Sequence, residues 1–346
     1  MQERRDTVLR LLIQTYLETG APVSSRTMCS QFPLGLCSAS IRNVMADLEE
    51  LGYITHLHTS AGRVPTDKGY RFYVDRLVPR TVLTPDEQQK INRELMEKQV
   101  VLEDVIRNTS RILSDFTHYA AVVAFPDLQQ SGFKSIQLAW LEERKICLTF
   151  VSTSGFTKSQ VISLETPIDR EWMLRIENFL NEQLENVPLT QARSKLRRLM
   201  IEERNSFFYV MKQAVELLEL SALNEQDVNI YLEGIGNIIK YSEFENAEML
   251  RSLLRVVEEK KKLADFMQGV IAQPAEHSIR VFIGEENPYE DLSNYSLIVG
   301  TYRIDDQSSG VLGIIGPKRL EYGRAIATVE YVTQILGQTI SRFNLT

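Results

Sequence analysis

The chain has 346 residues, 43% of them hydrophobic and 25% charged, and a formal net charge of −7. This composition predicts a soluble globular protein with two or three cores, and no apolar run approaches the roughly 18 residues that a membrane span needs. Because the charged N-terminus, MQERRDTVLR, enters a helix directly, we expect neither a secretory signal nor a lipid anchor and place the protein in the cytoplasm.

The charge is unevenly distributed along the chain. Residues 1–80 contain ten lysines and arginines against eight acidic residues, a net charge of +2 that leaves −9 for the rest. An acidic chain is by itself a poor candidate for nucleic-acid binding, but a mildly basic head on an acidic body favours binding through one end. The modest charge of that head predicts a complex that weakens markedly as salt rises.

The first predicted elements are two short helices. Apolar spacing predicts a helix over residues 3–19, which Gly20 ends. Pro22 then forces an extended step before Ser24, a good N-cap for a second helix that runs to about Phe32. The turn PLGLCS follows and leads to a third helix.

The third helix carries the candidate base-reading residues. Its apolar positions recur at helical spacing and must be buried, and they are Ile41, Val44, Met45, Leu48 and Leu51. Ser38 is a plausible N-cap, and Ser38, Ser40, Arg42 and Asn43 lie off the apolar face. Arginine pairs with guanine, asparagine with adenine, and serine with base or phosphate. We therefore predict that this end of the helix enters a major groove.

A two-stranded hairpin is predicted directly after this helix. Gly52 can close the helix in a left-handed conformation, residues 53–58 and 63–66 have strand character, and residues 59–62 form the turn. Helix, turn, helix and hairpin together predict a winged helix-turn-helix, whose wing touches the DNA backbone or minor groove. The candidates for wing and backbone contacts are Thr59, Ser60, Arg63 and Lys68. An amphipathic helix with a hairpin is also common as plain structure, and the aromatic residues of the next helix, near 67–78, more often pack than stack on bases.

The rest of the chain alternates between strands and helices. A polar linker precedes one long expected helix over 85–117, and Pro188 divides a helical block at 169–220. Strands followed by helices and then by strands again predict an α+β body with an insertion. The expected strands lie at 119–125, 134–141, 145–151, 158–164, 228–234, 279–284, 296–303 and 310–316, and the later helices at 243–267 and 322–343.

Four separated motifs resemble the bacterial heat-inducible transcription repressor family, HrcA. They are GAPVSSRTM at 20–28, SIRNVMADLEELGY at 40–53, HTSAGRVPTDKGYRFYVD at 58–75 and GVLGIIGPKRLEYGRAIATVEYV at 310–332. The resemblance implies a winged-helix head, a GAF-like α/β body and an inserted helical/β dimerisation domain. We expect the head at 1–80, a linker helix at 81–118, the body at 119–165 and 241–346, and the insertion at 166–240. The hairpin at 133–164 could instead belong to the insertion.

The resemblance also implies a function. It implies a homodimer that represses chaperone genes by binding an inverted-repeat operator upstream of the groESL and dnaK operons and releases it on heat stress. A GroEL-type chaperonin is implied as the partner that keeps the repressor competent to bind. Two tethered heads would match a palindrome and gain effective concentration, which supports a dimer on physical grounds.

No catalytic or metal-binding pattern stands out. The four histidines and three cysteines show no metal-ligand spacing or nucleophile arrangement, so we expect no enzyme activity and no cofactor. Cys29, Cys37 and Cys147 are expected to be reduced, buried thiols, although Cys29 and Cys37 flank one turn and could form a redox switch. The alternative function is a small-molecule sensor, because GAF-like bodies often bind ligands.

Overall fold

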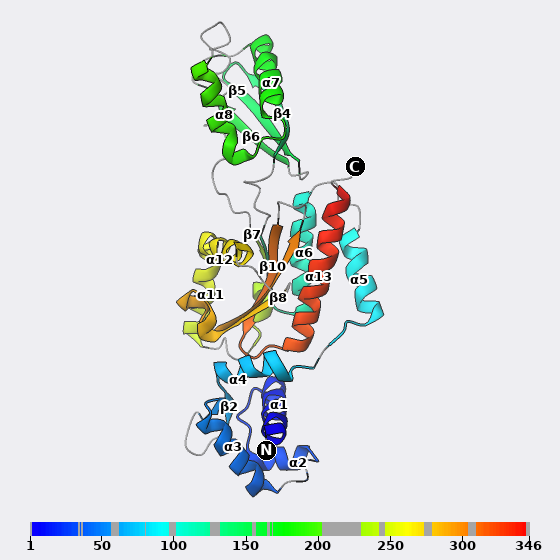
Figure 1. The fold of residues 1–346 in the computed structure, drawn as a ribbon, viewed down its shortest axis with the longest axis vertical. Coiled ribbons are helices and arrows are strands. Elements are labelled where there is room, and N and C mark those ends of the chain that lie inside the picture. Colours follow the sequence, from blue (N-terminus) through cyan, green and yellow to red (C-terminus); the bar gives the residue numbers. More distant parts are fainter. Residues whose placement is uncertain are drawn as a thin grey trace.

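The structure is a computed structural model that shows three parts arranged along one long axis (Figure 1). The head lies at one end, a central body follows, and a smaller lobe lies at the other end. The residues that the structure describes are 2–33, 35, 37–56, 62–79, 81–96, 102–124, 132–153, 157–164, 167, 169–202, 230–241, 246–272, 279–303 and 309–343.

The head is a helix-turn-helix followed by a short hairpin, as the sequence predicts. Its elements are α1 (Gln2–Thr19), α2 (Ser25–Gln31), α3 (Ser38–Glu50), β1 (Ile54–Thr55), β2 (Val64–Pro65) and α4 (Asp67–Phe72), which a π-helical turn (Tyr73–Leu77) extends. Their apolar faces meet in one core, formed by Val8, Leu9, Leu12, Ile13, Met28, Ile41, Met45, Leu48 and Ile54.

Gly20, Ser24 and Gly52 take their predicted places at helix ends, whereas Ser38 does not. The Ser24 hydroxyl accepts a hydrogen bond from the Thr27 backbone N–H at 3.0 Å, and Gly52 has a left-handed φ of +77°. Ser38, however, is the first helical residue, and Cys37 occupies the N-cap position without a side-chain capping bond. The Ser38 hydroxyl is instead within hydrogen-bonding distance of the Ser25 hydroxyl of α2, at 3.2 Å.

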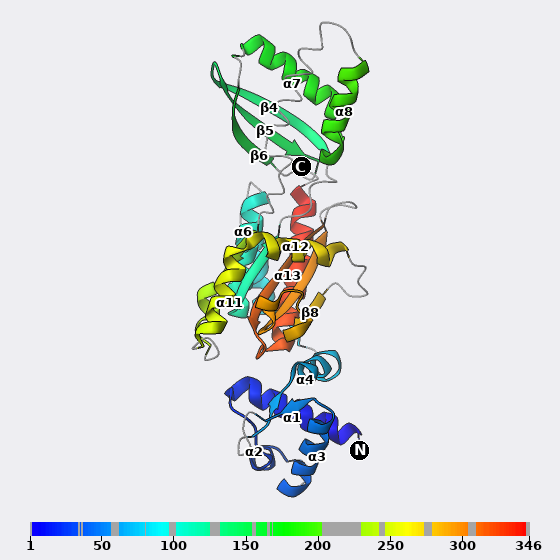
Figure 2. The same ribbon diagram turned by 90° about the vertical axis from the view of Figure 1, so that its left-hand side faces the viewer.

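The body is built on a five-stranded antiparallel sheet with the strand order β7-β3-β10-β9-β8. Helices α11 and α12 cover one face, while α5, α6 and α13 cover the other (Figures 1 and 2). Alternate residues of the strands face the two helical layers, so the sheet separates two apolar clusters. The strands are β3 (Ala120–Ala124), β7 (Ile230–Glu233), β8 (Ile279–Ile283), β9 (Tyr295–Arg303) and β10 (Ser309–Pro317), and the helices are α5 (Pro85–Met96), α6 (Leu102–Thr117), α10 (Ile235–Ile238), α11 (Ala247–Glu258), α12 (Lys260–Ala272) and α13 (Tyr322–Phe343).

Two helices that the sequence predicts as continuous, over 85–117 and 243–267, are each divided in two. The expected helix over 85–117 is α5 and α6, and the Asn108 amide donates to the Glu94 carbonyl oxygen at 2.8 Å between them. Both helices pack beside α13, so they belong to the body and do not only connect it to the head. The expected helix over 243–267 is interrupted at Glu259, whose backbone φ and ψ of −87° and 50° leave the helical region. Charged and polar residues interrupt the apolar spacing near both divisions, with Lys98 and Gln99 in the first and EEKKK at 258–262 in the second.

The distal lobe contains a separate three-stranded antiparallel sheet. Its strands are β4 (Phe133–Glu142), β5 (Lys145–Ser152) and β6 (Thr157–Ser163), and its helices are α7 (Arg170–Leu184) and α8 (Leu189–Glu202). Two side chains of α7 accept hydrogen bonds from backbone N–H groups on the outer edge of β4. Asn181 Oδ1 accepts a hydrogen bond from the Ile136 N–H at 2.7 Å, and Glu177 Oε2 accepts one from the Leu138 N–H at 2.6 Å. These bonds satisfy backbone groups that an edge strand otherwise exposes.

This strand pairing differs from the expected domain boundaries. The hairpin at 133–164 lies in the distal sheet beside α7, and none of its strands joins the body sheet. Strand β7, expected inside the insertion, pairs with β3 of the body. The part of the expected helical block at 169–220 that follows residue 202 lies outside the described residues.

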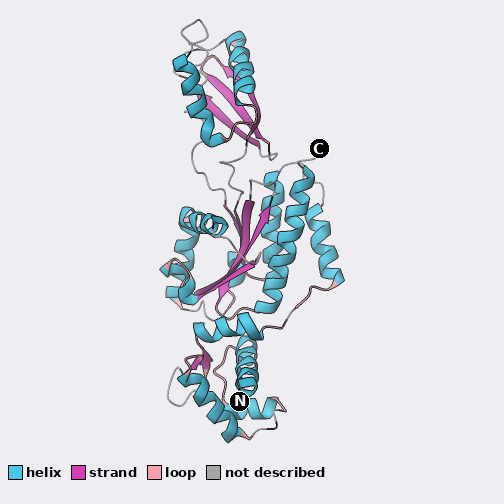
Figure 3. Cartoon of the chain, in the orientation of Figure 1, coloured by secondary structure: helices cyan, strands magenta, loops and turns pink. Residues whose placement is uncertain are grey.

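The α+β fold class is confirmed. Helices accompany the two sheets and the small wing hairpin, and each sheet belongs to one part of the molecule (Figure 3). None of the described helices is both long and apolar enough to cross a membrane.

Candidate nucleic-acid interface

The recognition-helix candidate α3 presents one polar face outward. Ile41 and Met45 point into the head core, whereas Arg42 and Asn43 are exposed. In the described part of the chain, neither Arg42 nor Asn43 has a side-chain hydrogen bond or ion pair that would occupy it. Their guanidinium and carboxamide groups are therefore available to meet a base edge.

The N-terminal serines of α3 are half-exposed and already in contact with neighbours. Besides the contact of Ser38 with Ser25, the Ser40 hydroxyl lies 3.3 Å from the Cys37 sulfur. The hydrogen bond from Ser40 lowers the pKa of the Cys37 thiol below its ordinary value. The contact with Ser25 brings the first turn of α2 beside the start of α3, so α2 contributes to the same surface.

The cysteines of the head are not buried. Cys29 and Cys37 are exposed, Cys147 of the distal lobe is half-buried, and none of the three is part of a disulfide among the described residues. The expectation of buried thiols is therefore wrong for Cys29 and Cys37. Both lie on the solvent side of the turn between α2 and α3, because the apolar faces of these helices are filled by Met28 and Ile41.

The wing is anchored to α3 through one carboxylate. Glu49 Oε2 accepts hydrogen bonds from Arg63 Nε at 2.9 Å and Nη2 at 2.8 Å, and Glu49 Oε1 pairs with His56 Nδ1. Arg63 follows the wing turn and His56 precedes it, so Glu49 holds both arms of the hairpin. Thr59 and Ser60, the candidates at the tip, lie outside the described residues.

Lys68 contacts the C-terminal end of the recognition helix. Its Nζ donates to the Leu51 carbonyl oxygen at 2.9 Å and lies 5.1 Å from the centre of the Tyr53 ring. A cation at the C-terminal end of a helix is favoured by the helix dipole. Lys68 thus connects α4 to the end of α3, in a position where it also remains exposed to solvent.

The structure therefore brings the candidates together in different ways. Ser38, Ser40, Arg42 and Asn43 share the start of α3, whereas Arg63 and Lys68 hold the wing and the helix end through internal contacts. The residues singled out from the sequence do not include Glu49. Its spacing from Arg63 and His56 has no local period, so only the folded hairpin identifies it as their partner.

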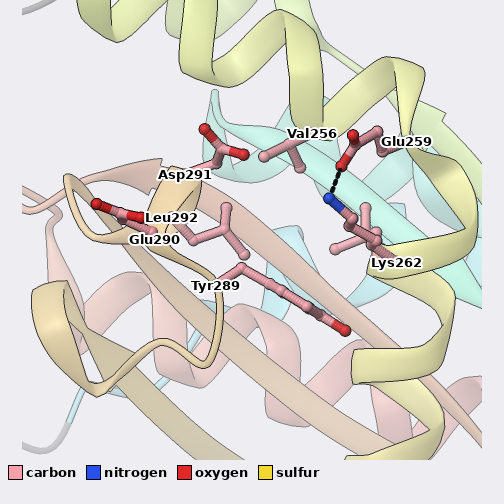
Figure 4. A pocket seen from close by; sticks show the side chains of 8 residues that line it. Val256, Glu259, Lys262, Tyr289, Glu290, Asp291 and Leu292 are labelled. Atoms are coloured by element: carbon pink, nitrogen blue, oxygen red, sulfur yellow. Dashed lines mark ion pairs between the residues drawn. The ribbon is translucent and has the colours of Figure 1, made fainter.

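A pocket of the body lies between α11, α12 and the turn before β9 (Figure 4). It has a volume of about 220 Å³ and is lined by Val256, Glu259, Lys262, Leu263, Tyr289, Glu290, Asp291 and Leu292. Glu259 pairs with Lys262 at 2.5 Å, and Asp291 pairs with Arg255 at 3.1 Å. Ligand pockets commonly measure about 300 Å³ or more, and charges that are already paired offer less to a small molecule. Among the residues that the structure describes, no three His, Cys, Asp or Glu side chains cluster in a way that could hold a metal ion.

Known proteins match this chain over nearly its whole length. A family profile described as "HrcA protein C terminal domain" matches residues 103–326. Proteins named "Heat-inducible transcription repressor HrcA" from Desulfitobacterium hafniense and Geobacter sulfurreducens are 33% and 34% identical, covering 99% and 98% of this chain and 98% of each relative. A crystal structure described as a hypothetical protein superposes with a TM-score of 0.63 at 25% identity, covering 99% of this chain and 98% of that chain.

Proposed function

Because the chain belongs to the HrcA family of heat-inducible transcription repressors, we propose that its head binds an inverted-repeat DNA operator and represses chaperone genes. Its relatives are named as repressors, a role that is not enzymatic. The observation that carries the proposal is the exposed pair Arg42 and Asn43 on α3 of a helix-turn-helix with a wing. A protein that acts on bacterial operators works in the cytoplasm, where the DNA is.

On DNA, α3 enters the major groove and the wing lies against the backbone. Arg42 and Asn43 read base edges, while Ser38 and Ser40 contact bases or phosphates near the helix start. Thr59 and Ser60 contact the backbone from the wing tip, and Arg63 and Lys68 add positive charge beside it. The operators proposed are the inverted repeats upstream of groESL and dnaK, released on heat stress.

The direct test is a titration of a labelled inverted-repeat duplex, followed by fluorescence anisotropy at two salt concentrations, against a scrambled duplex. We expect tighter binding to the repeat and weaker binding as salt rises, because phosphate contacts release counterions. Equal binding of both duplexes at both salt concentrations would contradict a specific repressor.

We also propose that the protein is a homodimer held together by the distal lobe. Three of the eight large hydrophobic side chains exposed in the described residues lie there, namely Leu141, Val161 and Leu174. On the sheet face turned away from the buried side chains, Ala139 of β4, Cys147 of β5 and Val161 of β6 stand in register. Val161 is 57% exposed, so an apolar strip crosses the open face of this sheet. Exposed apolar patches of this kind mark association surfaces.

The variant Val161→Glu is therefore expected to shift the protein from dimer to monomer, measured by sedimentation at micromolar concentration. A charge on the strip would have to be desolvated in the interface. Leu174→Glu is the matched control, because Leu174 is 53% exposed but lies on α7, outside the strip. Dissociation by Leu174→Glu and not by Val161→Glu would move the proposed interface to the helical side of the lobe.

A GroEL-type chaperonin is proposed as the partner that returns the repressor to its binding-competent form. The support is the family membership, together with a head that depends on one small core and on long-range contacts for its position. After dilution from denaturant, we expect more operator-binding activity to be recovered with the chaperonin and ATP than without them. Equal recovery under both conditions would remove the chaperonin from the proposal.

The alternative function, a small-molecule sensor, is favoured by one observation, the pocket beside α12. Its small volume and its paired charges make it the weaker candidate. An effector that changed operator affinity, and whose effect was lost when Leu263 was enlarged to Trp to fill the pocket, would support a sensor function.

A further inference from the structure

The first turns of α4 join the head to the body through paired charges. Asp67 accepts two contacts from Lys318 Nζ, at 2.7 Å and 2.9 Å, and a third from the Glu285 backbone N–H at 3.2 Å. Lys318 follows β10, and Glu285 lies in the turn after β8, so two separate segments of the body converge on one head carboxylate. Both side chains of the ion pair are about 70% shielded from solvent, with exposures of 28% and 29%.

One turn later, Arg71 makes a second set of bonds to the same turn of the body. Its Nε donates to Glu286 Oε1 at 2.8 Å, and its Nη2 donates to the Val281 carbonyl oxygen at 2.5 Å and contacts Glu286 Oε2. Its Nη1 also pairs with Asp75 within the head, at 3.1 Å. A guanidinium held by a carboxylate in two places fixes orientation as well as distance.

An aromatic cluster fills the space between these charged contacts. Tyr70 and Tyr73 of the head lie against Tyr322 at the start of α13, with ring centres 5.9 Å and 6.5 Å apart, respectively. All three rings are buried. On the far side, Arg319 Nη1 donates to the Leu17 carbonyl oxygen of α1 at 2.9 Å. The contact therefore involves both the first and the last helix of the head.

The body side of this contact is itself held in place. The Asn287 amide, which is buried, donates to the carbonyl oxygens of Gly284, Leu292 and Tyr295 at 2.8 to 3.0 Å. Gly284 has a φ of +58°, and a Cβ there would lie 1.8 Å from Asp67 Oδ2. The turn thus has the backbone shape and the close approach that only glycine permits.

Helix α4 also contacts the recognition helix α3. Lys68, which lies between Asp67 and Arg71 in sequence, binds the last turn of α3 through the Leu51 carbonyl oxygen. A continuous set of contacts therefore runs from α3 through Lys68 and α4 to Lys318 and Glu286. Movement of α4 relative to the body would carry α3 with it.

We propose that this head–body clamp, formed by Asp67 and Arg71 with Lys318 and Glu286 around the three tyrosines, sets the half-site spacing that the repressor accepts. The inference rests on the proposed function, since it needs a dimer that binds two half-sites. With the clamp closed, the two recognition helices have one separation and one relative rotation. With the charged contacts removed, each head turns on its linker and tolerates other spacings.

The experiment uses the full-length chain with body-side substitutions only, so that the DNA-reading head keeps its sequence. The variant is Glu286→Gln with Lys318→Ala. The matched control is Arg255→Ala with Asp291→Asn, which removes an ion pair of the body that is not part of the clamp. Affinities are measured by anisotropy for one half-site, for the inverted repeat, and for repeats whose spacer is changed by two base pairs. Two base pairs rotate one half-site by about 70° relative to the other.

We expect the wild type and the control to bind the natural repeat about tenfold or more tightly than the altered repeats, since only one spacing allows both heads to bind together. The clamp variant should keep its half-site affinity within about twofold and lose most of this preference. Unchanged half-site affinity also shows that the head remains folded. A clamp variant with the wild-type preference would overturn the inference and leave the proposed function intact. Failure of the wild type to bind any duplex would instead overturn the proposed function, and the inference with it.

Discussion

The double variant Arg42→Ala, Asn43→Ala is expected to lose at least about 25-fold in affinity for the inverted repeat. Each base-edge contact is worth about 1 to 3 kcal/mol, or about 5- to 150-fold, and separate contacts add approximately. The loss occurs in both heads of a dimer, so the observed effect should exceed the value for one head. Anisotropy titrations of the repeat and of the scrambled duplex measure it.

The preference for the repeat over the scrambled duplex distinguishes the loss of base contacts in this double variant from a simple loss of positive charge. We expect the double variant to bind the scrambled duplex nearly as well as the wild type does. Arg63→Ala should weaken binding to both duplexes alike and lower the salt slope by about one per head, because it removes a proposed phosphate contact and also the bond to Glu49 that anchors the wing. Arg93→Ala, which removes an exposed cation of α5 in the body, controls for net charge. An operator affinity unchanged by the double substitution would mean that α3 is not the recognition helix.

Ile41→Ala is expected to destabilise the head by about 2 to 5 kcal/mol. Ile41 is fully buried where α3 packs on the rest of the head, and removing a buried isoleucine side chain leaves a cavity as well as a loss of apolar contact. A small domain has about 5 to 15 kcal/mol of stability, so the variant should lose a large share of it. Operator binding should fall with the folded fraction.

The positions of the two tryptophans allow unfolding of the head to be distinguished from unfolding of the distal lobe. Trp140 and Trp172 both lie in the distal lobe, so their fluorescence follows the lobe, whereas circular dichroism near 222 nm follows all helices. In urea, the dichroism should show an early transition, moved by about 1 M or more to lower concentration, while the fluorescence midpoint stays in place. Glu50→Ala, an exposed change on the same helix, should leave both within about 0.5 kcal/mol. A dichroism curve for Ile41→Ala that matched that control would contradict the assigned core.

The sequence by itself determined the local elements and the family. Apolar spacing placed α1 and α3 and separated Ile41 from Arg42, because a residue's face on a helix depends only on its position in the helical period. Alternation and turn residues likewise placed the strands, and Gly52 ended α3 as predicted. The four motifs sufficed to identify the family that the profile and the relatives show.

The tertiary structure decided which of these elements and side chains meet. It assigned β7 to the body sheet and grouped β4 to β6 in a sheet of their own. It also paired Arg71 with Glu286, 215 residues away, and gave Arg63 to Glu49. The sequence contains no periodic signal for such ion pairs. They depend on how elements that are distant in the sequence pack together, and the spacing of residues within one element does not show which other element it will contact. For this reason α3 could be read from the sequence, whereas its attachment to the body could not.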